Sequence, residues 1–292
     1  MENSGGPVPL GPDSLTWRYF GDWRNVLVML WTGSMQNMHP RLGLAVEQHS
    51  RFFGERWKRV FRSFYPILGV VYDGARARET AVEVRGHHTA IRGADDSGAA
   101  YHALEPDVFY WAHAVFFMTT IRFGDRFMGG VPEAARRQLF AEHVQWYALY
   151  GLSMRPVPGS WEEFQTYWDD MCSRVLVDNK ATRDVLDLAG LPKPHFLPAV
   201  PQALWSPLWA LLARGFRWLT TGLYDPVIRD RLGLSWSDLD EHLHRVLGRA
   251  VHLAFRLVPH DRRFHPRARA GWRRSRGAVV DPVESPTRHL PG

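Results

Sequence analysis

Two adjacent histidines stand between two arginines in the segment VEVRGHHTAIRG, residues 82–93, in which no carboxylate follows the second residue. On a helix beginning after Thr80, Arg85 lies three residues before His88 and Arg92 lies four residues after it. At about 100° per residue, both arginines fall within about 60° of the imidazole, on one face. The segment therefore predicts a histidine with a positive charge on either side.

A lone imidazole between guanidinium groups is a poor site for a free Zn²⁺, which takes three or four carboxylate, Cys or His ligands. The arrangement suits a planar, anionic metallocofactor. Haem b needs one strong axial ligand and cationic partners for its two propionates, which arginine binds in a bidentate manner. The neighbouring charges would also lower the pKa of His88 and keep its ring neutral, free to bind iron. The alternative is an exposed helix on which an arginine-rich chain produces this spacing by chance.

The composition limits the kind of protein. With 45% hydrophobic and 13% aromatic residues in 292, the chain is typical of a globular protein with a large core. Its single cysteine, Cys172, excludes a disulfide framework and a multi-cysteine zinc or iron–sulfur site. Cys172 also lacks the glycine-rich ligand loop of a cytochrome P450. No C-x-x-C-H segment for covalent haem, Walker A, G-x-G-x-x-G or G-x-S-x-G motif is present.

The charge is +6, and the excess lies in residues 262–276, where arginines occur without any acid. No DNA-reading motif precedes this run, so we expect no specific nucleic-acid partner. A solvated tail or a contact with an anionic membrane is expected instead. Residues 204–224 could lie in a membrane interface, but Arg214 and Arg217 interrupt them, and an amphipathic core helix is the commoner explanation. The first residues show no secretory signal, so a cytoplasmic location is expected.

The spacing of apolar residues predicts an all-α fold. Pro40, Pro106 and Pro132 can each occupy the first turn of a helix. Ser160 and Glu163 match a capping box at the head of a further helix. We therefore expect one helical domain over residues 13–276, with 1–12 and 277–292 as flexible termini. The proline-rich residues 188–202 would connect its two halves.

The segment at 82–93 resembles the V-R-x-x-H and V/I-R pattern of the latex-clearing protein family, the rubber oxygenase catalytic domain. That family includes a fungal endoplasmic-reticulum oxygenase of mycophenolic acid biosynthesis and actinobacterial relatives. The resemblance covers roughly residues 13–274 and continues in five further segments: QNMHP, VEQHS, YHALEPDVFYWAHA, AEHVQWYALYG and TTGLYDPVIRDRLGLSWS.

The resemblance implies a helical fold enclosing a non-covalent haem b, with His88 as the proximal iron ligand and Arg85 and Arg92 near the haem. On the distal side the family carries R-x-x-K-T, and this chain reads Arg59-Val60-Phe61-Arg62-Ser63. The carry-over thus assigns Arg59, Arg62 and Ser63 to the catalytic side of the pocket.

Arg62 replaces the family lysine that can approach the iron. Arginine stays protonated and is a poor iron ligand. The iron would then be five-coordinate or water-bound, or capped by another histidine such as His39 or His113. Arg62 could instead donate a hydrogen bond to the oxidant. For His113, which lies within an apolar run, a satisfied core histidine is the plain alternative.

The resemblance implies a haem-dependent oxidoreductase that acts on a hydrophobic small molecule with O₂ or peroxide, in secondary-metabolite tailoring. Hydroxylation, desaturation and C=C cleavage all stay open. Two other classes are a non-catalytic haem sensor or carrier and a haem-free interaction protein. Substrate-dependent oxygen consumption separates the enzyme from the sensor, and absorbance in the Soret region separates both from the third class.

Overall fold

The structure is a computed structural model that describes residues 6–49, 56–95, 97–188, 193 and 201–280. For residues 56–63 and 202–204 it describes the backbone alone. Most of the predicted connection at 188–202, residues 1–5 and residues 281–292 therefore lie outside the described residues. Within the described part nearly all regular structure is helical, so the all-α prediction is confirmed.

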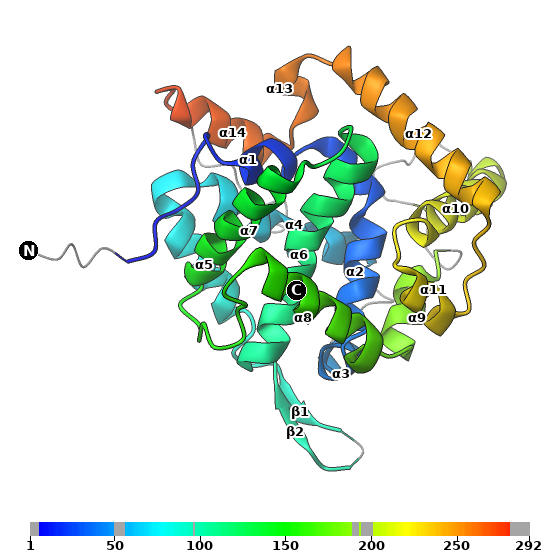
Figure 1. The fold of residues 1–292 in the computed structure, drawn as a ribbon, viewed down its shortest axis with the longest axis horizontal. Helices are drawn as coiled ribbons and strands as arrows, with labels where there is room; N and C mark the ends of the chain where they lie inside the picture. Colours follow the sequence, from blue (N-terminus) through cyan, green and yellow to red (C-terminus); the bar gives the residue numbers. More distant parts are fainter. Residues whose placement is uncertain (1–5, 50–55, 96, 189–192, 194–200, 281–292) are drawn as a thin grey trace, which may run out of the picture.

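The regular structure is a succession of helices along the chain (Figure 1). The α-helices are α1 Leu15–Tyr19, α2 Met29–Asn37, α3 Pro40–His49, α4 Arg56–Tyr72, α5 Ala77–Gly86, α6 Pro106–Phe127, α7 Glu133–Ala148, α8 Trp161–Asp170, α9 Lys180–Leu186, α10 Gln202–Thr221, α11 Pro226–Leu232, α12 Asp238–Arg256, α13 His260–Arg263 and α14 Pro266–Ser275. Shorter turns are the 3₁₀ helices η1 Trp23–Leu27 and η2 Gly74–Arg76 and the π-helical η3 Met171–Val175. A small antiparallel hairpin, β1 Arg92–Ala94 and β2 Ala100–His102, projects from the body (Figure 1). The sequence pattern did not indicate this hairpin.

Helix α6 runs through the middle of the molecule, between α7 and α2 (Figure 1). It also contacts α1 and α12. Most of its residues are buried, including both aromatic and polar side chains. A helix that is apolar on all sides belongs in the interior of a protein, which is why the run from Pro106 forms a buried helix rather than a strand.

Most helix starts follow the expected signals. Pro40 begins α3, and Pro106 begins α6. Helix α7 begins one residue later than expected, because Pro132 is its N-cap and not its first residue. At the head of α8 the Ser160 hydroxyl accepts a hydrogen bond from the Glu163 backbone N–H at 3.1 Å. The Glu163 carboxylate accepts from the backbone N–H of Gly159 and not from that of Ser160, so only half of the expected capping box forms. A complete capping box lies at the head of α12, between Ser237 and Asp240.

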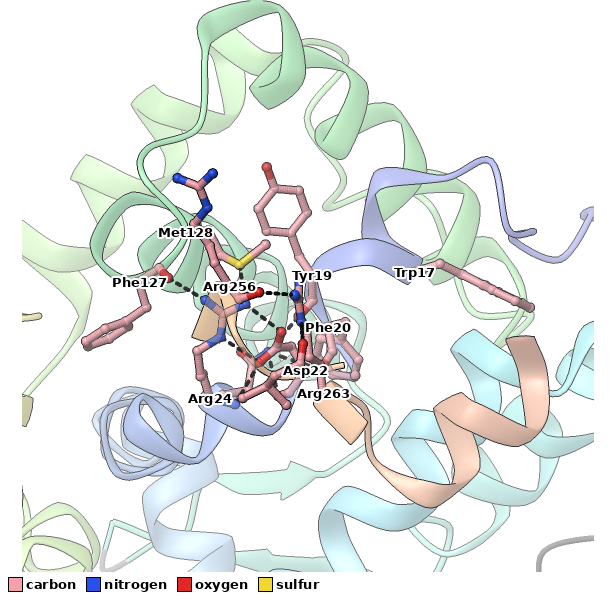
Figure 2. Close-up of polar contacts among 12 residues, drawn as sticks. Trp17, Tyr19, Phe20, Asp22, Arg24, Phe127, Met128, Arg256 and Arg263 are labelled. Atoms are coloured by element: carbon pink, nitrogen blue, oxygen red, sulfur yellow. Dashed lines mark hydrogen bonds and ion pairs between the residues drawn. The ribbon is translucent and has the colours of Figure 1, made fainter. Parts of the chain in front are cut away.

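A buried ion pair joins distant parts of the chain (Figure 2). The Arg24 Nε and Nη2 atoms donate to the Asp22 carboxylate at 2.9 and 2.7 Å, and Nη1 donates to the Phe127 carbonyl at 2.8 Å. The guanidinium also lies over the Phe255 ring, 4.6 Å from its centroid. Because both charged side chains are buried, η1, the end of α6 and the end of α12 meet at one satisfied charge pair.

The basic run at 262–276 is in large part not a solvated tail. Residues 266–275 form α14, which packs against α4, with Ala268 fully buried. Arg267 pairs with the Asp73 carboxylate, and its Nη1 donates to the Tyr65 carbonyl at 3.0 Å. Arg274 lies 3.6 Å from the same carboxylate. The expectation of a solvated tail was wrong for these residues, because the acid that neutralises Arg267 and Arg274 lies about two hundred positions away along the chain.

In the described part of the chain, no helix has the length and apolar character needed to cross a bilayer. The segment 204–224 forms most of α10, as an amphipathic core helix would. Its second half packs inward through Ala213 and Leu219, while Leu208 and Leu211 of its first half are exposed.

Substituting Arg24 by methionine tests the buried pair. Removal of the guanidinium leaves the Asp22 carboxylate buried without its counter-charge, so we expect the free energy of unfolding to fall by about 3–5 kcal/mol. Urea denaturation followed by circular dichroism measures the change. The control is Arg76→Gln, which breaks the exposed pair with Glu79 and should change stability by less than about 1 kcal/mol. Similar losses in the two variants would contradict the role given to Arg24.

Candidate functional site

The segment that carries His88 is shorter as a helix than expected. Helix α5 ends at Gly86, and His88 lies in the turn that follows. Its backbone N–H donates to the Arg85 carbonyl at 3.0 Å, whereas a continued helix would use the carbonyl of Val84. Gly86 favours the end of the helix, because glycine has a low helix propensity. The His88 side chain then hydrogen-bonds to the Val84 carbonyl, which a continued helix would have used. Arg92 consequently begins β1, so the prediction that both arginines share one helical face with His88 was wrong.

The His88 ring is fixed by its own backbone. Nδ1 donates to the Val84 carbonyl at 2.8 Å, and because a carbonyl only accepts, this nitrogen carries the proton of the neutral ring. Nε2 has no hydrogen-bond partner among the described residues. The half-buried ring packs edge to face with Phe109, with the ring centroids 5.6 Å apart. The imidazole is therefore held in one tautomer with its other nitrogen available.

Burial is the main cause that lowers the pKa of His88 below its usual value of 6.5, and the charge of His87 lowers it further. The hydrogen bond to Val84 acts in the opposite direction. The expected direction is thus confirmed, but its cause is desolvation and not the flanking arginines. A neutral ring at neutral pH is the form that binds a metal.

These features fit an axial haem ligand. Histidines that bind metals usually donate the second ring N–H to a carbonyl or carboxylate, which sets the tautomer and the ring orientation. His88 makes this contact with Val84 and leaves Nε2 without a hydrogen-bond partner among the described residues. Within the described ranges, no group of three or more His, Cys, Asp or Glu side chains is placed to hold a free metal ion.

The two arginines have different surroundings. Arg85 Nη1 donates to the carbonyls of Tyr150 and Gly151, at 2.9 and 3.3 Å, and so joins the end of α5 to the loop after α7. Gly151 has a positive φ of 64°, which favours glycine at this turn. Arg92 is exposed, and its carbonyl faces His49 Nε2 at 3.1 Å. The structure therefore keeps Arg85 beside His88 and moves Arg92 into the hairpin.

The distal candidates fall in α4, which packs against α5. The backbone of Arg59, Arg62 and Ser63 belongs to this helix, but their side chains lie outside the described residues. The structure thus sets the helix that carries them beside the helix that leads to His88. Their roles stay predictions from the resemblance.

The two other histidines considered for the iron are buried. The Nδ1 atom of His39 has no hydrogen-bond partner among the described residues. Desolvation is the main cause that lowers the pKa of His39 to about 4. His113 Nε2 faces the His143 carbonyl at 3.1 Å, and its ring stacks on His143 with 4.4 Å between centroids. The tight aromatic surroundings of His113 favour its interpretation as a core histidine, although its Nδ1 also has no hydrogen-bond partner in the described part.

An aromatic group surrounds this region, and residue spacing alone did not point to it. Phe109 lies between the His88 ring and Tyr150. The centroids of the Phe109 and Tyr150 rings are 5.2 Å apart. Tyr110, the next residue, reaches His143 Nε2 through its hydroxyl at 3.1 Å. Both residues belong to the segment YHALEPDVFYWAHA, so the resemblance was the one signal that marked them.

Comparison with known proteins identifies the family. Residues 17–253 match the family described as "ER-bound oxygenase mpaB/B'/Rubber oxygenase, catalytic domain". The chain belongs to this family. It is also 24% identical over 234 residues to uncharacterized proteins of Mycobacterium bovis and Mycobacterium tuberculosis, covering 77% of this chain and 87% of each relative. No solved structure gives a significant match. The match confirms the resemblance and an oxygenase-type catalytic domain.

The burial of His113 predicts a pH dependence of stability. An unfolded imidazole takes up a proton as the pH falls through 6.5, whereas desolvation lowers the pKa of His113 in the folded protein to about 3. The unfolded state binds the extra proton across this window, so the folded state loses stability as the pH falls. Between pH 7 and 4 this residue should account for a loss on the order of 3 kcal/mol.

Urea denaturation at several pH values measures this effect. His113→Phe keeps an aromatic ring in the stack and should reduce the dependence between pH 6.5 and 4 by about the amount given for His113. His87→Ala is the control, because water reaches that exposed ring in both states. Equal slopes for the wild type and His113→Phe would exclude the assignment.

Proposed function

We propose that the protein is a haem b-dependent oxidoreductase that acts on a hydrophobic small molecule with O₂ or peroxide. The observation that carries the proposal is the His88 ring, which is anchored through Nδ1 to the Val84 carbonyl and keeps Nε2 available. Membership of an oxygenase family supports the same conclusion. Haem would supply the oxidative chemistry, and the chain would supply binding, orientation and the exclusion of water.

The residues have separate tasks in this proposal. His88 would hold the iron, and the Val84 carbonyl keeps the ring from rotating away from it. Arg85 Nη1 is used by the Tyr150 carbonyl, so its remaining N–H groups are the ones that can face a propionate. Arg92 lies in the exposed hairpin, so it would contact the haem only at the edge of the macrocycle, as a partner of a propionate. Phe109 adds an apolar wall beside the imidazole.

The finer parts of the function rest on the resemblance. They are a role in secondary-metabolite tailoring, a cytoplasmic location and the distal positions of Arg59, Arg62 and Ser63. A protonated arginine at position 62 would donate hydrogen bonds to the oxidant and favour negative charge there. It would not bind the iron as an amine does.

Replacing His88 by alanine tests the cofactor proposal. We expect a folded protein that has lost most of its haem, because the imidazole proposed to hold the iron is gone. The measurement is a pyridine haemochrome assay with an absorption spectrum, and circular dichroism checks the fold. The matched control is His87→Ala, which removes the adjacent exposed ring and should retain haem. Full haem occupancy in His88→Ala would reject the assignment and direct attention to His39 or His113.

Arg62 is tested by two substitutions. Arg62→Ala should keep its haem and bind cyanide about tenfold more weakly, because a charged donor near the bound anion is lost. Arg62→Lys introduces an amine and should shift the ferric spectrum toward low spin. Arg76→Ala, at an exposed position of η2, is the control. Wild-type cyanide affinity in Arg62→Ala would show that Arg62 has no distal role.

A further inference from the structure

Helix α12 presents an apolar face to solvent along its whole length. Six large aliphatic side chains on it, or directly after it, are between 38% and 87% exposed: Leu239, Leu243, Val246, Leu247, Leu253 and Leu257. At about 100° per residue, these side chains and two alanines fall within an arc of about 120° around the helix axis. Along the axis they extend over about 27 Å. We call these six residues the apolar face of α12. An exposed surface of this size on a protein usually marks an interaction site.

The face cannot be buried by rotation of the helix. The opposite side of α12 is fixed to the body, where Gly248 lies so close to α6 that a β-carbon would overlap the Arg126 carbonyl oxygen. His244 is fully buried, and its Nε2 lies 3.0 Å from the Leu219 carbonyl. Figure 1 shows α12 along the rim of the molecule, so its outer side is open. The apolar face is therefore a permanent part of the surface.

A row of positive charge follows one edge of this face. Arg245, Arg249 and Arg256 lie between about 100° and 140° from the centre of the apolar arc, all on the same side. No acid occurs between positions 242 and 257. Arg245 lies 3.8 Å from Glu241, whereas Arg249 and Arg256 have no acidic partner among the described residues. Exposed apolar and cationic rows thus run side by side.

We propose that the apolar face of α12 docks the protein on the surface of an anionic lipid bilayer. A helix of this kind lies in the plane of the interface, with its apolar side in the boundary between headgroups and acyl chains. The arginine row would then meet lipid phosphates, and the anionic cytoplasmic leaflet attracts such a row. The sequence left a peripheral membrane contact open at 204–224 and 262–276, and the structure directs attention to α12 between them.

The charge pattern favours a bilayer over a second copy of the chain. When two α12 helices pair antiparallel through their apolar faces, the same edge of each helix lies side by side. The two arginine rows would then lie on the same side of the helix pair, where neighbouring like charges oppose association. A bilayer surface places anionic groups beside the row instead.

Co-sedimentation with lipid vesicles tests the proposal on the full chain. Vesicles of phosphatidylcholine alone are compared with vesicles that contain about one third phosphatidylglycerol. We expect the wild type to bind the anionic vesicles about tenfold more tightly and to release them as salt is raised. Leu243→Gln/Leu253→Gln should bind about tenfold more weakly, because it removes apolar contact. Arg249→Gln/Arg256→Gln should lose the preference for anionic lipid.

The matched control is Val8→Gln/Val227→Gln, which changes exposed apolar side chains that do not belong to α12 and should bind as the wild type does. All substituted positions are exposed, and thermal melting checks that each variant is folded. Equal binding to neutral and anionic vesicles, or full binding by Leu243→Gln/Leu253→Gln, would overturn the proposal. So would a wild-type dimer in light scattering that this leucine variant converts to a monomer, because a second copy would then cover the face.

Discussion

The near-complete burial of α6 is the constraint on which the rest of the structure depends. A buried helix must satisfy its polar side chains from its neighbours, because water cannot do so. Thr119 bonds Thr32 of α2 at 2.7 Å, and His113 faces the His143 carbonyl of α7. At its C-terminal end the Phe127 carbonyl accepts from Arg24. Each contact fixes a different surrounding element, so α6 sets the positions of α2, α7 and η1 together.

The same helix places the candidate site. Phe109 belongs to its first turns and meets the His88 ring, while Tyr150, which follows α7, packs on Phe109 from another side. Arg85 donates to the Tyr150 carbonyl. The turn with the anchored imidazole is thus supported by elements that α6 holds in place, and a site built on rigid elements keeps its geometry well.

Much of the fold could be predicted from the sequence, because local signals control it. Pro40 and Pro106 begin helices since proline fits the first turn, and the apolar run after Pro106 is buried as its composition requires. The misses have longer-range causes. The charges of Arg267 and Arg274 are neutralised by Asp73, which no local pattern can reveal.

The site was predicted less completely. The sequence predicted a neutral His88 ring, but its tautomer and the end of α5 depend on a side-chain hydrogen bond to Val84 that periodicity does not contain. For this reason Arg92 was placed on the wrong element. Phe109 carried no chemical signal of its own, since an aromatic residue in an apolar run is ordinary core.

The position of α14 has a consequence for how the domain is delimited. The family match stops at residue 253, yet the chain beyond it supplies part of the core: Trp272 meets Trp17 edge to face at 5.3 Å, and Phe264 is buried. A chain that ended at residue 253 would expose part of Trp17 and Tyr72 to water. It would also leave the Asp73 carboxylate without Arg267 and Arg274. The folded core of this protein therefore extends past the C-terminal end of the region that matches the family.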